Sequence, residues 1–194
     1  RSEAAAIFAR LLAEKNGDTI STAANTKFAD IPAHAWYSGY VKYLANNGIT
    51  YGKSKTIFAP NDAITRAEFT TMAVRFFDVY GDGNAEIMEQ FSGFNDVSSG
   101  YWAAEYIKYA ALHGWINGYG DGSFHADREI NRAEVVTIVN RLLGREADED
   151  YIADNLRKLN TFPDVSRKHW AYYAVMEAAN AHTAVLGESE SWSK

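Results

Sequence analysis

The chain of 194 residues contains no cysteine, so disulfide bonds and thiolate metal sites are excluded. It also has no run of 18 or more apolar residues and no signal peptide, so direct membrane insertion is not expected. Positive charge is scarce, because 19 Lys and Arg stand against 25 Asp and Glu and leave a net charge of −6. Nucleic-acid binding requires clustered Lys and Arg, so a nucleic-acid partner is not expected either.

The composition is otherwise that of a folded domain. Hydrophobic residues make up 47% of the chain and charged residues 23%, which are ordinary globular values. The sequence opens at Arg1 in the middle of a motif that recurs later, so we expect it to be part of a longer protein. The lack of an export signal then leaves the location of that protein open.

The most informative feature is an internal repeat over residues 28–75 and 94–141. After its first phenylalanine, each copy has Trp at offset 8, Gly at offsets 20 and 24, and Arg-Ala-Glu at offset 38. These positions are Phe28, Trp36, Gly48, Gly52 and Arg66 in one copy, and Phe94, Trp102, Gly114, Gly118 and Arg132 in the other. Identical offsets over so many positions indicate one structural unit used more than once.

Two half-copies flank the complete ones. The stretch from Phe162 to Trp170 repeats the opening half, but its polar tail carries no Arg-Ala-Glu. The chain start, Arg1-Ser-Glu, reads as a closing half without its opening half. Three opening and three closing halves suggest a pseudo-threefold assembly.

Both halves have helical patterns. In each closing half the residues 3, 6, 7, 10 and 11 positions after the motif arginine are apolar, which gives one buried stripe. Each opening half is expected to be a helix that includes its tryptophan, and a glycine-marked loop separates the two halves. The linkers at residues 78–92 and 146–161 contain short apolar periodic runs and are expected to add helices, whereas residues 16–27 are expected to be a loop.

The Arg-Ala-Glu motif opens the closing helix with a capping box. Thr65 would accept the backbone N–H of Glu68, and Glu68 would reach back to the Thr65 amide. Asn131 and Glu134 repeat the arrangement. We therefore interpret these residues chiefly as helix caps.

The motif arginines Arg1, Arg66 and Arg132 are harder to explain as helix formers. A cation at the first helical position faces the positive end of the helix dipole, at a cost of roughly 0.3–1 kcal/mol. One reading is an anion that binds there to free N–H groups and the guanidinium. The other is a salt bridge to an aspartate of a neighbouring repeat, such as Asp30 or Asp96. The residues alone leave both open.

The remaining residues favour structural roles. Repeat-locked aromatic residues are expected mostly in the core, and Asp30, Asp96 and Asp164 are expected to cap the turn that follows them. The five histidines share no metal-ligand spacing, and no nucleophile elbow, zinc-protease motif or phosphate loop is present. The sequence therefore predicts no catalytic residues, no metal and no cofactor; a glycosidase with paired carboxylates is the weighed alternative, disfavoured because the repeated acids serve as caps.

Four segments together resemble the S-layer homology (SLH) domain. They are Phe94-Asn-Asp-Val, Trp102-Ala, Gly118-Tyr-Gly-Asp-Gly-Ser-Phe124 and Ile130-Asn-Arg-Ala-Glu134. The resemblance covers nearly the whole chain except the linkers and the last dozen residues. Asn131 stands where the family usually has Thr. The loop of the first copy lacks the Gly-Asp-Gly found in the loop of the second copy. The grooves that the family forms between its repeats are therefore not expected to be equivalent in this chain.

The resemblance implies a mainly α fold, a pseudo-threefold helical prism of three SLH repeats joined by glycine-containing loops. The expected segments are a closing half with linker at 1–27, complete repeats with linkers at 28–93 and 94–161, and an opening half with a divergent polar tail at 162–194. The family binds secondary cell-wall polymer, often through a pyruvylated amino sugar, in grooves between repeats. The residues implied as ligand-binding are Arg1, Arg66, Arg132, Trp36, Trp102, Trp170, Gly52, Gly118, Asp30 and Asp96.

The function implied is a non-catalytic module that anchors an exported protein to the bacterial surface through this cell-wall polysaccharide. Such a module is extracellular and is expected to be monomeric by itself. Two alternatives stay open, namely a self-assembly module of a surface layer without sugar binding, and a tether that links an outer membrane to peptidoglycan.

Overall fold

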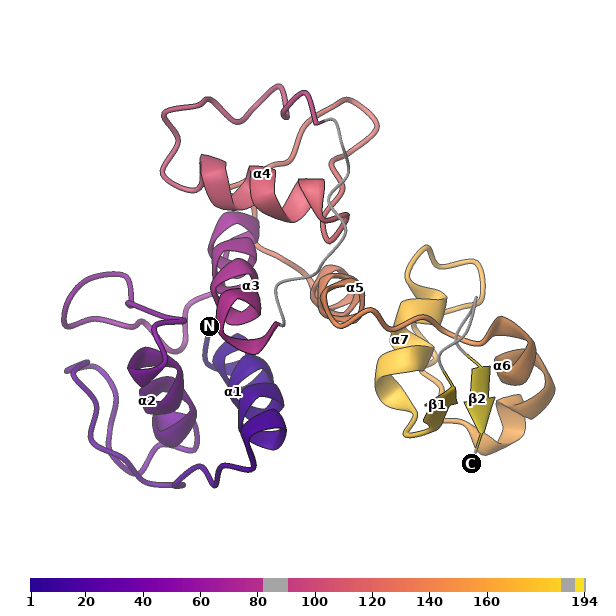
Figure 1. Cartoon of the computed structure of the whole chain (residues 1–194), viewed down its shortest axis with the longest axis horizontal. Helices are drawn as coiled ribbons and strands as arrows, with labels where there is room; N and C mark the ends of the chain where they lie inside the picture. The colour runs from indigo at the N-terminus through magenta and orange to yellow at the C-terminus, as the bar shows by residue number, and fades with distance from the viewer. Residues whose placement is uncertain (82–90, 186–190, 194) are drawn as a thin grey trace. The chain divides into compact units, whose positions relative to one another are not determined.

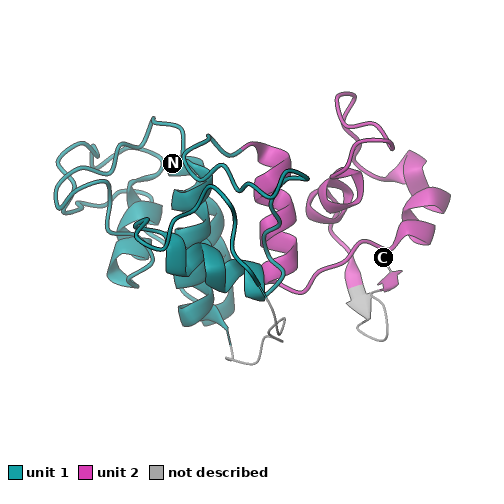
Figure 2. Cartoon of the chain, turned by 90° about the horizontal axis from the view of Figure 1, so that it is seen from above, with its two compact units in different colours: residues 1–130 teal, residues 131–194 magenta. Residues whose placement is uncertain are grey.

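The computed structural model describes residues 1–81, 91–185 and 191–193. The chain divides into two compact units, Arg1–Ile130 and Asn131–Lys194 (Figure 2). The described residues are mainly helical, as expected from the sequence. Among them no helix has both the length and the apolar character that a membrane crossing requires.

Unit 1 contains two closing helices and two opening helices. The closing helices are α1 (Ser2–Asn16) and α3 (Arg66–Tyr80), and the opening helices are α2 (Ser38–Asn46) and α4 (Ala104–Leu112). The apolar stripe expected on the closing helices is confirmed, since Phe8 of α1 is buried with its ring 5.3 Å from that of Phe69 and 5.0 Å from that of Phe76 of α3. Helices α1 and α3 therefore pack together at the centre of unit 1, and Figure 1 shows the two helices side by side.

Each closing helix packs against the opening helix of the next repeat. In unit 1, α1 packs on α2 and α3 packs on α4 (Figure 1). In the sequence repeat an opening half comes before its own closing half. In the structure, by contrast, a closing helix pairs with the opening helix that follows it along the chain. This offset explains how a chain that begins with a closing half still forms complete helix pairs.

The opening helices end at the glycine of offset 20. Gly48 and Gly114 follow α2 and α4 with φ of 73° and 68°, a left-handed conformation that glycine adopts without strain. At the other end, Trp36 and Trp102 lie in turns that precede these helices. The expectation that the tryptophans belong to the helices is wrong, because the helices begin only at Ser38 and Ala104.

Unit 2 contains α5 (Arg132–Leu142), α6 (Glu149–Asn155), the 3-10 helix η1 (Leu156–Lys158) and α7 (Tyr172–Ala179). Helix α5 packs on α7, which repeats the pairing of unit 1. The expected extra helix in the third linker is confirmed by α6. The run expected to be helical in the second linker falls largely on residues 82–90, outside the described residues.

The tail of unit 2 forms an antiparallel hairpin of β1 (Thr183–Val185) and β2 (Ser191–Ser193), with Ala184 paired to Trp192. Trp192 is only 6% exposed, and its backbone N–H donates to Asp148. Its ring belongs to the core of unit 2, together with Ile152, Tyr172 and Met176. The tail expected as a divergent polar segment therefore contributes a core residue. The threefold arrangement and the repeat boundaries stay predictions.

Candidate functional site: a groove beside helix α3

Both predicted capping boxes are present. The Thr65 hydroxyl accepts the N–H of Glu68 at 3.2 Å, and Glu68 accepts the N–H of Thr65 at 3.0 Å. Asn131 and Glu134 exchange the same two hydrogen bonds at the start of α5. The sequence thus located the first residues of α3 and α5 correctly.

The start of α3 is not an open anion site. The N–H groups of Arg66 and Ala67 donate to the carbonyl oxygens of Arg128 and Ala126, each at 2.9 Å. In α1 the N–H of Ser2 donates in the same way to Pro60. The expectation that free helix N–H groups bind an anion is wrong at these positions, because the loop of the next repeat already supplies acceptors.

The motif arginines hold that same loop. The Nε atom of Arg1 donates to the carbonyl oxygen of Phe58, and that of Arg66 to the carbonyl oxygen of Phe124, each at 2.8 Å. The guanidinium carbon lies 5.3 Å from the Phe58 ring centre for Arg1 and 4.4 Å from the Phe124 ring centre for Arg66. These contacts offset the unfavourable position of a cation at the start of a helix.

The repeated aspartates also bind the loop. The Asp30 carboxylate accepts the N–H groups of Phe58 and Ala59, and the Asp96 carboxylate accepts those of Phe124 and His125. These bonds span 28 and 29 residues, so the expectation that the aspartates cap the turn directly after them is wrong for both. The third aspartate of the motif, Asp164, is exposed.

Gly52 and Gly118 make room for the first phenylalanine of each repeat. A Cβ atom on Gly52 would lie 2.4 Å from the Phe28 ring, and one on Gly118 would lie 2.5 Å from the Phe94 ring. Those rings in turn pack on Phe58 and Phe124. Packing against these rings therefore requires glycine at both positions, whether or not a ligand binds.

The three motif tryptophans lie at the surface. Trp36 is 54% exposed, Trp102 56% and Trp170 64%. The expectation that repeat-locked aromatic residues lie mostly in the core holds for the phenylalanines of the loops but is wrong for these three. An exposed aromatic ring at a repeated position is available to a ligand.

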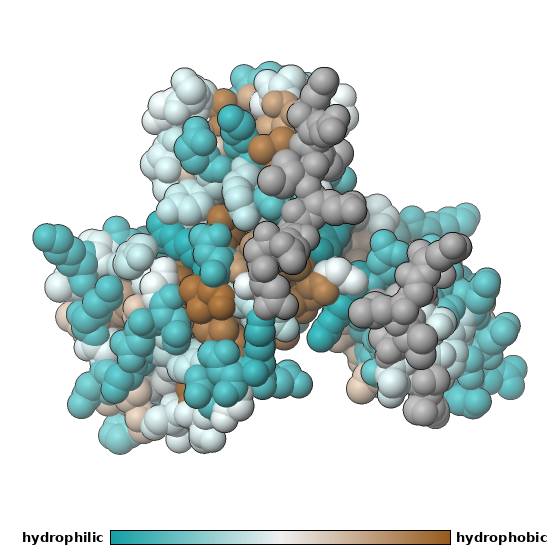
Figure 3. Space-filling view, in the orientation of Figure 1, coloured by the Kyte–Doolittle hydropathy of each residue, from teal (hydrophilic) through white to brown (hydrophobic). Residues whose placement is uncertain are grey.

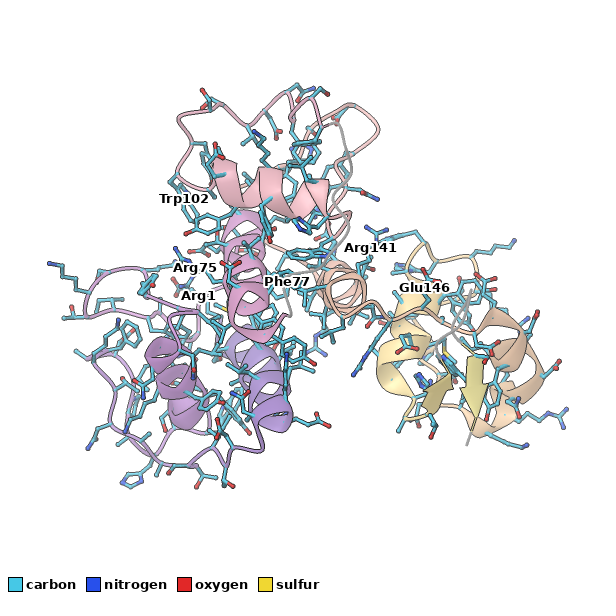
Figure 4. All side chains as sticks on the ribbon, in the orientation of Figure 1. Arg1, Arg75, Phe77, Trp102, Arg141 and Glu146 are labelled. Atoms are coloured by element: carbon cyan, nitrogen blue, oxygen red, sulfur yellow. The ribbon has the colours of Figure 1, made fainter. Side chains whose placement is uncertain are left out.

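In unit 1 these features meet in a groove on one side of α3, with a pocket of about 80 Å³. Arg1, Arg75 and Trp102 lie along this side of α3 in Figure 4, and hydrophobic surface shows between the α4 lobe and the α1–α2 lobe in Figure 3. The complete lining is Arg1, Ile49, Thr50, Tyr51, Gly52, Glu68, Thr71, Met72, Arg75 and Trp102. Four residues implied by the sequence resemblance or its capping motif therefore come together: Arg1, Gly52, Glu68 and Trp102.

Positive charge dominates this groove. Arg1 and Arg75 contribute two guanidinium groups, and Glu68 contributes one carboxylate, which lies 2.6 Å from a guanidinium nitrogen of Arg1. The excess of one positive charge occurs in a chain whose net charge is −6. Its partly enclosed position strengthens attraction to an anion relative to open solvent.

Arg75 was missed as a site residue by the sequence analysis. Its guanidinium lies over two tyrosine rings, 4.7 Å from the centre of Tyr51 and 4.9 Å from that of Tyr106, and donates to the Tyr106 hydroxyl. Arg10, nine residues after Arg1 as Arg75 is after Arg66, makes the equivalent contact with Tyr40 but does not line the groove. The nine-residue spacing was the available signal.

The repeats agree with comparisons to known proteins. The family model of the S-layer homology domain matches residues 27–70 and 93–136. The two complete repeats belong to the S-layer homology domain family. The SLH matches begin one residue before Phe28 and Phe94 and end inside α3 and α5.

The SLH chain has relatives whose names describe surface or anchoring proteins. It is 32% identical to "Cell surface glycoprotein 1" and 30% identical to "Cellulosome-anchoring protein", both of Acetivibrio thermocellus, over 98% and 97% of its own length. It is 31% identical to the "Surface-layer 125 kDa protein" of Lysinibacillus sphaericus over 74% of its length. The chain spans only 8%, 40% and 12% of these three relatives.

The third SLH arginine differs from the other two. Arg1 and Arg66 are 9% and 4% exposed, whereas Arg132 is exposed. Arg1 and Arg66 bind a phenylalanine carbonyl 57 and 58 residues further on, and the sequence has no phenylalanine at either distance from Arg132. The sequence therefore does not repeat the pairing of a motif arginine with a loop phenylalanine at Arg132.

Among the residues that the structure describes, no three His, Cys, Asp or Glu side chains are grouped so that they could hold a metal ion. Four carboxylates occupy repeated positions of the motif and accept backbone N–H groups: Asp30, Asp96, Glu68 and Glu134. The two aspartates bind the loops, and the two glutamates cap the helices.

Proposed function

We propose that this chain anchors an exported protein to the bacterial cell wall by binding an acidic sugar of a secondary cell-wall polymer in the groove beside α3. The observation that carries the proposal is the placement of Arg1 and Arg75 together with an exposed Trp102 in one groove. The ligand we propose is a pyruvylated or otherwise acidic amino sugar. No catalytic step is part of this proposal.

The chemistry of the groove supports a carboxylate attached to a sugar ring. A guanidinium can hold a carboxylate through two parallel hydrogen bonds, and the two tyrosines beside Arg75 fix its plane. Trp102 offers a broad apolar face at the edge of the pocket on which a sugar ring can lie. Thr50 and Thr71 add hydroxyl groups to the same lining.

Arg66 is proposed to serve a second site by repeat equivalence. Like Arg1 it is buried, holds its loop phenylalanine, and has the motif glycine Gly118 in that loop. The other family-implied positions, Arg132, Trp36, Trp170, Asp30 and Asp96, stay predictions as ligand contacts. The carboxylates of Asp30 and Asp96 already accept backbone N–H groups of the loops, which explains both residues without a ligand.

The extracellular, cell-surface location expected from the sequence is confirmed by the SLH family match and by relatives that are named as surface proteins. One relative is named as a cellulosome-anchoring protein, which supports an anchoring role for this chain. The identity of the polymer, the presence of an acidic group on it and the attachment of an exported protein are proposed.

Co-sedimentation of the chain with purified cell-wall sacculi tests the proposal. Arg75→Ala should lower the affinity about tenfold or more, the loss expected for a charge-assisted hydrogen bond. Arg75→Lys should retain part of the binding, because it keeps the charge but loses the planar fork. Arg10→Ala is the matched control, since it removes the same tyrosine contact outside the groove.

Two results would contradict this function. Equal losses for Arg75→Ala and Arg10→Ala would mean that the arginine–tyrosine contact stabilises the helix pair and nothing more. Full binding to sacculi from which the acidic polymer has been stripped would refute the acidic-sugar ligand and favour the peptidoglycan tether.

A further inference from the structure

A second pocket of unit 1 lies on the other side of the Tyr101–Trp102 dipeptide. Its volume is about 540 Å³, and it is lined by Asp96, Tyr101, His125, Ala126, Asp127 and Arg128. Trp102 lines the arginine groove and Tyr101 lines this pocket, while their two rings are 5.8 Å apart. The two cavities therefore share one aromatic wall.

The backbone ties the two cavities together as well. Ala126 of the second pocket accepts the N–H of Ala67, the residue beside Glu68 of the groove. Both cavities thus lie at the first turn of α3, within a single compact unit.

The size of the groove pocket limits what it can hold. Its volume of about 80 Å³ is far below that of the second pocket, which is about 540 Å³. The rest of a polymeric ligand must lie outside it, and the 540 Å³ pocket falls within the size range of small-molecule sites, about 300–1,000 Å³.

The second pocket has the polar groups that bind sugar hydroxyls. The Tyr101 hydroxyl donates to Asp127 at 2.6 Å, and both Asp127 and Arg128 are exposed. Desolvation and the hydrogen bond to Asp127 raise the pKa of Tyr101 to about 12, so the phenol keeps its proton and its bond to Asp127. Carboxylate acceptors and a guanidinium donor together match the mixed donors and acceptors of a neutral sugar.

We infer that this pocket is a second subsite of the wall-polymer site, which takes the neutral, hydroxyl-rich sugar residue next to the acidic sugar bound by Arg1 and Arg75. The inference rests on the proposed function of the groove and extends it from one sugar to at least two. Tyr101 and Asp127 bind the second sugar, and the Tyr101–Trp102 wall lies beneath the link between the two residues.

The subsite belongs to the second complete repeat alone. At the equivalent positions, 66 residues earlier, the first repeat has Ala35, Ala59 and Asn61 in place of Tyr101, His125 and Asp127. The phenol, the imidazole and the carboxylate are therefore absent from the first copy. The earlier positions supply matched controls for substitutions in the subsite.

The test uses wall polymer that is released from sacculi by a muramidase, cleaved within the polymer chain and fractionated by length, so that the shortest fraction carries one acidic sugar. Binding of each fraction to the full chain is measured by calorimetry. Asp127→Ala should weaken binding of the long fraction about tenfold and leave the shortest fraction unchanged. Tyr101→Phe should give a smaller loss of the same kind, and Asn61→Ala should change neither affinity.

The other outcomes overturn the inference. Unchanged binding of long fragments to both Asp127→Ala and Tyr101→Phe would show that the pocket is not used. Equal losses for long and short fragments, with a lowered melting temperature, would show that Asp127 only supports the loop. Failure of the wild-type chain to bind any fraction would instead refute the groove proposal itself, so the two failures are distinguishable.

Discussion

The guanidinium of Arg1 and the carboxylate of Glu68 lie 2.6 Å apart and join the first residue of one closing helix region to the first turn of the next. The same Glu68 side chain caps α3 by accepting the N–H of Thr65. One carboxylate therefore sets both the start of α3 and the position of a groove arginine.

Glu68→Gln should separate these two roles. Glutamine also completes a capping box, so the cap survives, whereas the charge that faces the largely buried Arg1 is lost. We expect a loss of about 1–3 kcal/mol in unfolding free energy, measured by chemical denaturation. Thr65→Ala is the complementary variant, because it removes the cap and keeps the ion pair; an unchanged stability of Glu68→Gln would show that the ion pair contributes nothing.

Gly118→Ala should destabilise unit 1, because the new Cβ would lie 2.5 Å from both the Phe94 ring and the carbonyl oxygen of Ser123. Overpacking of this kind costs about 1–3 kcal/mol, which thermal unfolding detects. Gly120→Ala in the same loop meets no atom within 4 Å and is the matched control. Equal melting temperatures for the two variants would mean that the loop shifts to accommodate the methyl group.

The helices and their caps could be predicted from the sequence because they depend on neighbours three and four residues away. The apolar stripe of each closing half and the pair Thr65–Glu68 are local patterns of this kind. The partners of the repeated aspartates could not be predicted in the same way. Asp30 binds an N–H 28 residues away, and its spacing from Phe58 does not show that the two meet.

Part of the candidate groove could be predicted as well. The resemblance to SLH domains brought Arg1, Gly52 and Trp102 forward, and all three line the groove. The role of Arg75 could not be predicted, because it depends on Tyr51 and Tyr106, which belong to two different repeats. The burial of Trp192 could not be predicted either, because the tail around it is polar and only the hairpin brings its ring into the core of unit 2.

The stability of unit 1 should decrease in acid through Asp96. Desolvation by itself raises the pKa of this carboxyl, but the N–H groups of Phe124 and His125 lower it more, so the folded pKa lies below the ordinary 3.8. A lowered folded pKa gives stability that is present above pH 3.8 and is lost as the pH falls through the folded value. Urea denaturation of the wild type and Asp96→Asn between about pH 6 and pH 2 should therefore converge in acid; parallel curves would contradict this role.

Trp102→Ala should weaken wall binding with little change in stability. The side chain is 56% exposed and lines the groove, so its removal takes away contact area for a sugar ring but little core packing. We expect a loss of affinity of about tenfold for sacculi and a change in unfolding free energy within about 0.5 kcal/mol. Trp36→Ala, which is equally exposed but does not line this groove, should retain more binding; the reverse order would contradict the assignment.

Trp192→Ala should destabilise unit 2, because it empties a core position that is 6% exposed and lies beside Ile152 and Met176. Loss of a buried tryptophan costs about 3–5 kcal/mol, enough to unfold a small unit or expose much of its backbone. Hydrogen exchange should then increase in α6 and α7, while α1 and α3 keep their protection. Trp170→Ala removes the same side chain from a position that is 64% exposed and should leave exchange unchanged. If both variants behave alike, the hairpin does not hold unit 2 together, and the core of this unit rests on its helices alone.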